Sequence, residues 1–244
     1  MPVPPVSEAS AGDHLRGVEL PAATIAPRSP LLSESKSPRR VGPPWLRPLG
    51  LLLLGFIPVI AGIGRLVQLA TITRPDPADA RFFDSPSSAV LHIVGASVFA
   101  VLGAFQFVPT WRRRWPQGHR TIGWILIPAA GVGTLGGLWM TAFYPLPPHD
   151  TPLLTGFRSL FGLLILVALA LGTRAALQRN FRAHGNWMLR AYAVAMAAGT
   201  QSLVLAPVVV LRGPLDALAS TLIMGACWFG NLAFAELWIR RDQG

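Results

Sequence analysis

Six apolar runs, each of about 20 residues or more, limit what this chain of 244 residues can fold into. They lie at residues 48–70, 88–108, 121–143, 153–172, 187–211 and 215–238. A helix of about 20 apolar residues crosses the roughly 30 Å hydrocarbon core of a bilayer. Backbone polar groups in lipid must be satisfied within the segment, so each run is expected to be a helix. The sequence therefore predicts an all-α, polytopic membrane bundle with six transmembrane helices.

The composition agrees with a lipid-exposed protein. Charged residues make up 13% of the chain and hydrophobic residues 52%, whereas a soluble domain carries about 25% charged residues. The net charge is +10, but the arginines stand at the ends of the apolar runs. That placement favours contact with anionic lipid, because nucleic-acid binding needs a basic stripe on a folded soluble face. We therefore expect the lipid bilayer as a partner and no nucleic acid.

The chain divides into two parts by composition. Residues 1–47 are rich in Pro and Ser and have no apolar periodicity, so we expect a disordered cytoplasmic tail. Residues 48–239 hold all six runs and form the predicted membrane domain. The only cysteine, Cys227, lies inside an apolar run, which excludes a disulfide within one chain.

Basic residues predict the orientation, because Lys and Arg accumulate in short cytoplasmic loops. They concentrate before the first run, after the second, after the fourth and after the sixth, at Arg39, Arg40, Arg47, Arg112, Arg113, Arg114, Arg120, Arg174, Arg179, Arg182, Arg240 and Arg241. The intervening joints are poorer in basic residues. Both termini are therefore expected in the cytoplasm. The arginine-rich composition is typical of a bacterial protein, which would place the chain in the inner or plasma membrane.

Polar residues inside the runs fall at two predicted depths. Such residues are costly in lipid and indicate functional sites. The outer level holds Arg65, His92 and Arg158, with His149 in the joint just above them. The inner level holds Gln106, His119, Arg120, His184, Arg190 and Glu236, and Gln201 lies near the middle of the fifth run. Glu236 is expected to pair with Arg190 or Arg120, since a pair removes the penalty of two lone charges.

The histidines at these depths suggest haem. Neutral imidazole is a common axial ligand of haem iron, and two imidazoles on facing helices can hold one haem b. His119 with His184 would ligate an inner haem, and His92 with His149 an outer one. Arg120 and Arg190 would pair with the propionates. Two haems at two depths would allow electron transfer across the membrane, to a redox or membrane-protein partner that the sequence does not identify.

Other interpretations of the same residues stay open. Histidines at a membrane interface often only bond to headgroups or cap a helix, and a metal or proton-relay role is another use. The chain would be a small transporter or proton-coupled carrier if Arg65, His92 and Arg158 formed an anion-attracting vestibule with a path beside Gln201. It would be a non-catalytic scaffold subunit if the polar residues only joined helices. No catalytic residues are assigned.

Several motifs carry a family resemblance. They are His92 and Gly103, then Gln106-Phe-Val-Pro, Arg112-Arg-Arg, His119-Arg120-x-x-Gly123 and His184-x-x-Trp187-Met188-x-Arg190. In order and spacing the stretch from about residue 90 to 203 resembles the DUF2306 family of uncharacterised bacterial integral membrane proteins. One departure is Trp124, which stands where the pattern would have Arg. The resemblance implies a multi-span fold with histidines near both faces, and it implies no activity.

Overall fold

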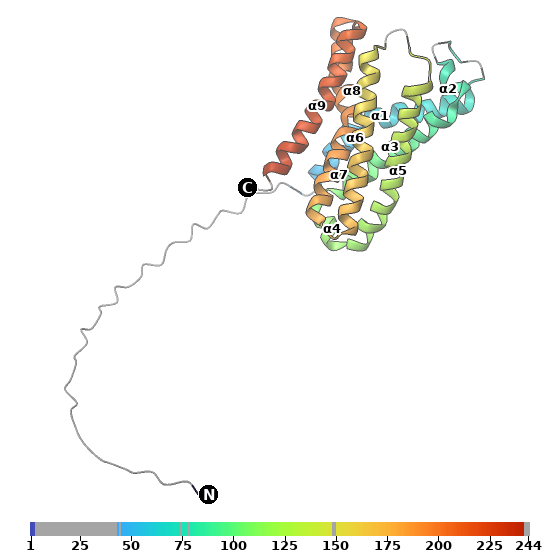
Figure 1. Ribbon diagram of the computed structural model, residues 1–244. Coiled ribbons are helices and arrows are strands. Elements are labelled where there is room, and N and C mark those ends of the chain that lie inside the picture. The colour runs from blue at the N-terminus through green and yellow to red at the C-terminus, as the bar shows by residue number, and fades with distance from the viewer. Residues whose placement is uncertain (3–42, 44, 74, 78, 148–149, 242–244) are drawn as a thin grey trace, which may run out of the picture. The chain divides into compact units, whose positions relative to one another are not determined.

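The computed structural model describes residues 1–2, 43, 45–73, 75–77, 79–147 and 150–241. Within these residues the chain is all helical, with nine helices and no strand, and the helices belong to one compact unit, Val41–Gly244 (Figure 1). The helices are α1 (Leu46–Thr71), α2 (Ala80–Asp84), α3 (Pro86–Gln106), α4 (Pro109–Arg114), α5 (Pro116–Phe143), α6 (Pro152–Leu177), α7 (Phe181–Ala195), α8 (Ala197–Arg212) and α9 (Ala217–Arg241). The predictions for the tail, almost entirely, and for His149 lie outside the described residues.

Six segments are long and apolar enough to cross a membrane, as predicted. They are α1, α3, α5, α6 and α9, together with the continuous stretch Phe181–Arg212 that contains α7 and α8. The membrane helices of the sequence prediction are therefore confirmed. The fifth prediction was a single helix, but the chain breaks at Met196, the residue between α7 and α8. The break accompanies a change of neighbours, since α7 packs mainly on α6 and α9 whereas α8 packs on α1 and α9.

Two helices begin more than one turn before their apolar runs. α5 starts at Pro116, because proline in the first turn gives up no hydrogen bond. α7 starts at Phe181, where the side chain of Asn180 accepts a 3.1 Å hydrogen bond from the backbone N–H of Ala183. Hydrophobicity alone misses these turns because they are polar. These polar first turns contain His119 and His184. Because both residues belong to regular helix, the helix geometry fixes the direction of their side chains.

Four helices close a ring. α3 packs against α5, α5 against α6, α6 against α7, and α7 back against α3. Two pairs therefore lie diagonally across the ring, α3 with α6 and α5 with α7. We call its two ends the α2 end, where α3 and α6 begin, and the α4 end, where α5 and α7 begin (Figure 1). Outside the ring, α1 contacts α3 and α8, and α9 contacts α6, α7 and α8.

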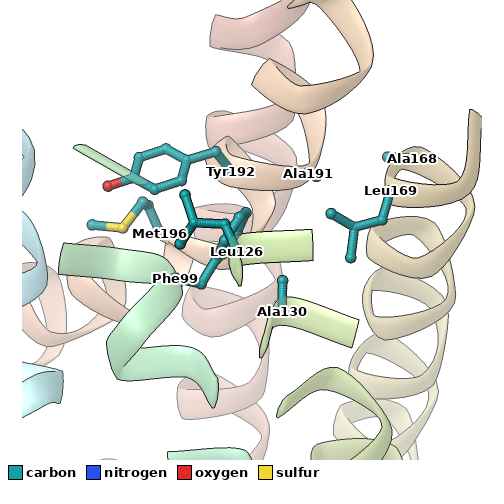
Figure 2. Packing of buried hydrophobic residues seen from close by; sticks show 8 residues of the cluster. All are labelled: Phe99, Leu126, Ala130, Ala168, Leu169, Ala191, Tyr192 and Met196. Carbon is teal, nitrogen blue, oxygen red and sulfur yellow. The ribbon is translucent and has the colours of Figure 1, made fainter. Parts of the chain in front are cut away.

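An apolar cluster fills the ring between its ends (Figure 2). Its members are Phe99, Leu126, Ala130, Ala168, Leu169, Ala191, Tyr192 and Met196, from all four helices and the α7–α8 break. The Tyr192 hydroxyl donates to the Ala100 carbonyl at 2.7 Å, which satisfies the polar end of this buried side chain. Gly103 makes room for this tyrosine, since an added Cβ would lie 2.5 Å from Tyr192 Cε2. The Gly103 of the family pattern therefore has a packing role.

Glycines let α3 and α5 touch backbone to backbone. A Cβ added at Gly95 would lie 2.4 Å from the Ala129 carbonyl oxygen and 2.8 Å from Gly133 Cα. A Cβ added at Gly133 would meet the backbone of Ala96 at 2.9 Å. Small residues at a helix crossing are the usual means of close association in membranes. Gly95 and Gly133 therefore have a packing role at the crossing of α3 and α5.

Candidate functional site

A cavity of about 430 Å³ opens at the α2 end and reaches the middle of the ring. Its volume lies in the range of about 300–1,000 Å³ that is common for small-molecule and cofactor sites. Polar side chains line it at Arg81, His92, Thr134, Thr141, Tyr144, Asp150, Thr155, Arg158 and Gln201. The deeper walls are apolar and include Phe99, Phe161 and Trp228, the last two with stacked rings 5.3 Å apart. The cavity therefore suits a ligand with an apolar body and a charged or polar edge.

His92 lines this cavity with a fixed protonation pattern. Its Nδ1 lies 2.8 Å from the carbonyl oxygen of Gly133 on α5. A carbonyl only accepts hydrogen bonds, so the bond requires the proton on Nδ1, and the neutral ring then carries its lone pair on Nε2. Gly137, one turn further along α5, also lies against the ring, since a Cβ there would be 2.9 Å from Nδ1. The two glycines thus orient the imidazole.

Arginines surround the mouth of the cavity. Arg158 donates to Asp150 Oδ2 at 2.5 Å, and Arg81 donates to the Pro145 carbonyl at 3.2 Å. Arg81 also stacks over the ring of Phe82, with its Cζ 4.7 Å from the centroid. Because a guanidinium has five N–H donors, these single contacts leave donors for an anionic group.

Arg65 stands next to the mouth without lining the cavity. Its Nη1 lies 2.8 Å from Asp79 Oδ2, and its Cζ lies 4.8 Å from the centroid of Phe82, which does line the cavity. The hydrogen bond from Arg65 holds the pKa of Asp79 below its ordinary value. Arg65, one of the two arginines predicted at the outer level, therefore pairs with Asp79 and packs against Phe82.

Two histidines lie near each other at the α4 end. His184 on α7 has its Nδ1 2.9 Å from the carbonyl oxygen of Gly172 on α6, which again requires the proton on Nδ1. His119 on α5 lies close enough to His184 and to Arg112 to interact with both electrostatically. Its Nδ1 is enclosed and has no hydrogen-bond partner in the described part of the chain. The diagonal helices α5 and α7 thus bring together the two histidines predicted as a pair.

Arg190 and Glu236 form the ion pair that the sequence suggested. Arg190 Nε lies 2.5 Å from Glu236 Oε1, and Arg190 Nη2 lies 2.9 Å from Oε2. The guanidinium also stacks over Trp187, 4.6 Å from the ring centroid. Arg120, the other predicted partner of Glu236, is exposed. The bidentate pair joins α7 to α9, so its first role is to hold these helices together.

The comparison with protein families bears on these residues. A family model described as a predicted membrane protein, DUF2306, matches residues 89–239. The chain belongs to the DUF2306 family. No curated protein and no solved structure matches it. The DUF2306 match runs past the stretch 90–203 of the resemblance and reaches into α9, so it includes Glu236 as well as its partner Arg190.

The structure gathers most of the predicted site residues of this DUF2306 protein into two places. His92, Arg158 and Gln201 line the α2-end cavity, and His119 and His184 lie near each other at the α4 end. Gln106 ends α3 at the α4 end, where its Nε2 is enclosed without a partner among the described residues. Gln201 uses its Nε2 to donate to the Met224 carbonyl at 3.1 Å.

Sequence reasoning missed three residues at the cavity mouth, Arg81, Tyr144 and Asp150. They lie outside the apolar runs, where a polar residue is ordinary and does not by itself indicate a site. The Tyr144 hydroxyl donates to the Ser85 carbonyl and so ties the α5–α6 joint to the start of α3. Tyr144 stands directly before a proline-rich joint. This was the feature of the sequence that could have indicated an ordered cavity mouth.

Proposed function

We propose that the protein binds haem b inside the four-helix ring at both ends and carries electrons between them. One observation carries the proposal, namely that the diagonal helices α5 and α7 bring His119 and His184 near each other. His119 on α5 and His184 on α7 lie at the α4 end, and His92 on α3 lies in a cavity at the α2 end.

The ring nitrogens support ligation. Histidines that bind metals usually donate their other N–H to a carbonyl or carboxylate, which fixes the tautomer and the ring orientation. His92 and His184 both do this, to Gly133 and Gly172 respectively. Each therefore has its Nε2 lone pair left for iron. Among the described residues no three His, Cys, Asp or Glu side chains cluster to hold a metal ion, whereas haem iron takes only one or two protein ligands.

Several features of the α2-end cavity support haem as its ligand. Gly133 and Gly137 leave space beside His92, and the deeper wall is apolar. Arg81 at the mouth would pair with one propionate, and Arg158 would donate to the other with the N–H groups that its pair with Asp150 leaves. The predicted second ligand, His149, belongs to the joint whose neighbours Pro147 and Asp150 line the cavity. The described residues thus support a haem with its propionates toward the α2 end.

The α4 end offers a similar set. The enclosed Nδ1 of His119 lacks a partner among the described residues, so a bound group or water must satisfy it. Arg190 is engaged by Glu236, so Arg112, which interacts electrostatically with His119, is the cation for a propionate here.

Bound haem would supply one-electron chemistry, and the chain supplies its surroundings. The histidines hold the group, the arginines balance its charge, and the apolar cluster between the two ends keeps water out. The two levels, marked by His92 and Gln106 on α3, are roughly 21 Å apart along the helix. We also infer that the α4 end faces the cytoplasm of a bacterial cell, because the exposed arginines 112, 113, 114, 174 and 182 gather there.

Electron transfer across a membrane can be tested with sealed vesicles. The purified protein, loaded with haem, is reconstituted into vesicles that enclose ferricyanide, and dithionite is added outside. The expected result is reduction of the enclosed ferricyanide at a rate that depends on bound haem. Electrons would pass from the haem at one end of the ring to the haem at the other end, across the apolar cluster. Equal rates with haem-loaded protein and with haem-free protein would contradict the proposal.

Gly137→Ala is expected to disturb the α2-end site alone. The new Cβ would lie 2.9 Å from His92 Nδ1 and 3.2 Å from Cε1, so the ring must shift and its bond to Gly133 must weaken. We expect a shifted reduction potential for one haem and an unchanged potential for the other. Potentiometric titration followed by absorption measures both. Gly131→Ala is the control, since a Cβ there meets nothing within 4 Å.

One observation favours a second candidate, a carrier for a small anionic or amphipathic solute. The break between α7 and α8 lines the cavity at Met196, and Gln201 lies beside it. Discontinuous helices near the middle of the bilayer are typical of transporter binding sites. Under this alternative, Gln201→Ala and Arg158→Ala each abolish a solute-uptake or resistance phenotype of the wild type. If both variants leave every such phenotype intact, the carrier function is excluded.

A further inference from the structure

A second hollow of about 400 Å³ lies on the outer face of the ring between α5 and α6. It is lined by Ile127, Gly131, Leu166, Leu169, Ala170, Thr173, Arg174 and Leu177. Its only hydroxyl, that of Thr173, donates back to the Leu169 carbonyl at 2.7 Å, so it offers no unsatisfied group to a ligand. The small residues Gly131 and Ala170 form the hollow, since a Cβ on Gly131 would meet nothing within 4 Å.

The hollow has the length of one leaflet. On α6 it runs from Leu166, near the middle of the span, to Leu177 at the α4 end. At 1.5 Å per residue this is roughly 16 Å, about half of the 30 Å hydrocarbon core. The surrounding side chains face the bilayer, for Leu163, Val167 and Leu177 are largely exposed. A membrane-facing apolar groove of this length matches a lipid acyl chain.

Basic residues stand where the headgroup of that lipid would lie. Arg174 lines the groove near the end of α6. Arg120 stands two turns before Ile127 on the same face of α5, with the exposed Trp124 between them. Neither α5 nor α6, both fully described, contains an acidic residue. The headgroup end of the groove is thus positive and next to an interfacial tryptophan, which suits a phosphate that carries a net negative charge.

We propose that this α5–α6 groove binds an anionic phospholipid, with one acyl chain between Gly131 and Ala170 and the phosphate at Arg174 and Arg120. The site is separate from both histidine sites and does not rest on the haem proposal. Lipid in the groove would cover the seam between two of the four ring helices. It would thereby support the ring that holds His119 and His184.

Native mass spectrometry can test the site on the full-length protein. The probes are phosphatidylglycerol and phosphatidylcholine with identical acyl chains, each added to delipidated protein. We expect phosphatidylglycerol to be retained about five-fold more than phosphatidylcholine, because an arginine near the membrane surface contributes about that factor. Arg174→Gln should remove most of this preference. Gly131→Leu, whose side chain fills the groove, should lower the retention of both lipids.

Arg182→Gln is the matched control, because Arg182 is an exposed arginine at the same end and does not line the groove. It should leave the lipid preference unchanged within about two-fold. Equal effects of Arg174→Gln and Arg182→Gln would show general attraction to a basic surface and would overturn the proposed site. Retention of both lipids by Gly131→Leu at the wild-type level would overturn it as well.

Discussion

Replacement of His184 by alanine is expected to reduce the haem content from about two per polypeptide to about one. His184 lies on the diagonal helix α7, and its hydrogen bond to the Gly172 carbonyl fixes the tautomer that leaves Nε2 for iron. Alanine at this position removes that ligand. His119→Ala should cause the same loss, because both histidines belong to the α4-end site. The His119→Ala/His184→Ala double variant should therefore lose no more haem than either single variant.

The α2-end site should behave independently. His92→Ala is expected to leave about one haem, and His92→Ala combined with His184→Ala should leave none. Haem extracted from purified protein and measured by absorption gives these numbers. His14→Ala is the matched control, since His14 belongs to the sequence before the membrane domain. A His184→Ala variant that keeps the full wild-type haem content would exclude His184 as a ligand.

The second large effect is expected at the crossing of α3 and α5. Gly95→Leu should prevent folding, and Gly95→Ala should destabilise the protein by about 1–3 kcal/mol, the usual cost of overpacking. The Cβ of residue 95 would lie 2.4 Å from the Ala129 carbonyl oxygen. Backbone atoms cannot turn aside as a side chain can, so α3 and α5 must separate. The separation also weakens the bond between His92 and Gly133.

Thermal unfolding in detergent measures this effect, with a drop of several degrees expected for Gly95→Ala. Gly64→Ala on α1 is the control, because a Cβ there meets nothing within 4 Å. It should leave the transition unchanged or raise it slightly, since alanine favours helix over glycine. A Gly95→Ala protein as stable as the wild type would show that the two helices are not held in backbone contact.

The spans were predictable from the sequence because lipid imposes a simple rule, that each crossing segment must be a helix of sufficient apolar length. The pairing of Arg190 with Glu236 was predictable for a similar reason. An unpaired charge in the membrane is costly, so opposite charges at the same depth are expected to form an ion pair. The break at Met196 was not predictable. Neither proline nor a polar residue stands there, and the break arises where α7 and α8 contact different helices.

The candidate sites were only partly predictable. Chain direction placed His119 and His184 at one level, and the ring then brought them onto diagonal helices. The sequence contained no sign that Gly133 and Gly172 would accept hydrogen bonds from His92 and His184, because those contacts depend on helix rotation. The role of Arg81 at the cavity mouth could not be predicted, because this arginine lies on the short helix α2, outside the spans.

The haem content of the wild-type protein tests the central claim most directly. The protein is produced in haem-replete cells, purified, and analysed for haem b and iron per polypeptide, with spectra before and after dithionite. We expect about two haems b, an intense Soret band and a spectral change on reduction. Purified protein that shows no Soret band, and takes up no haem when haem is added, would contradict the account.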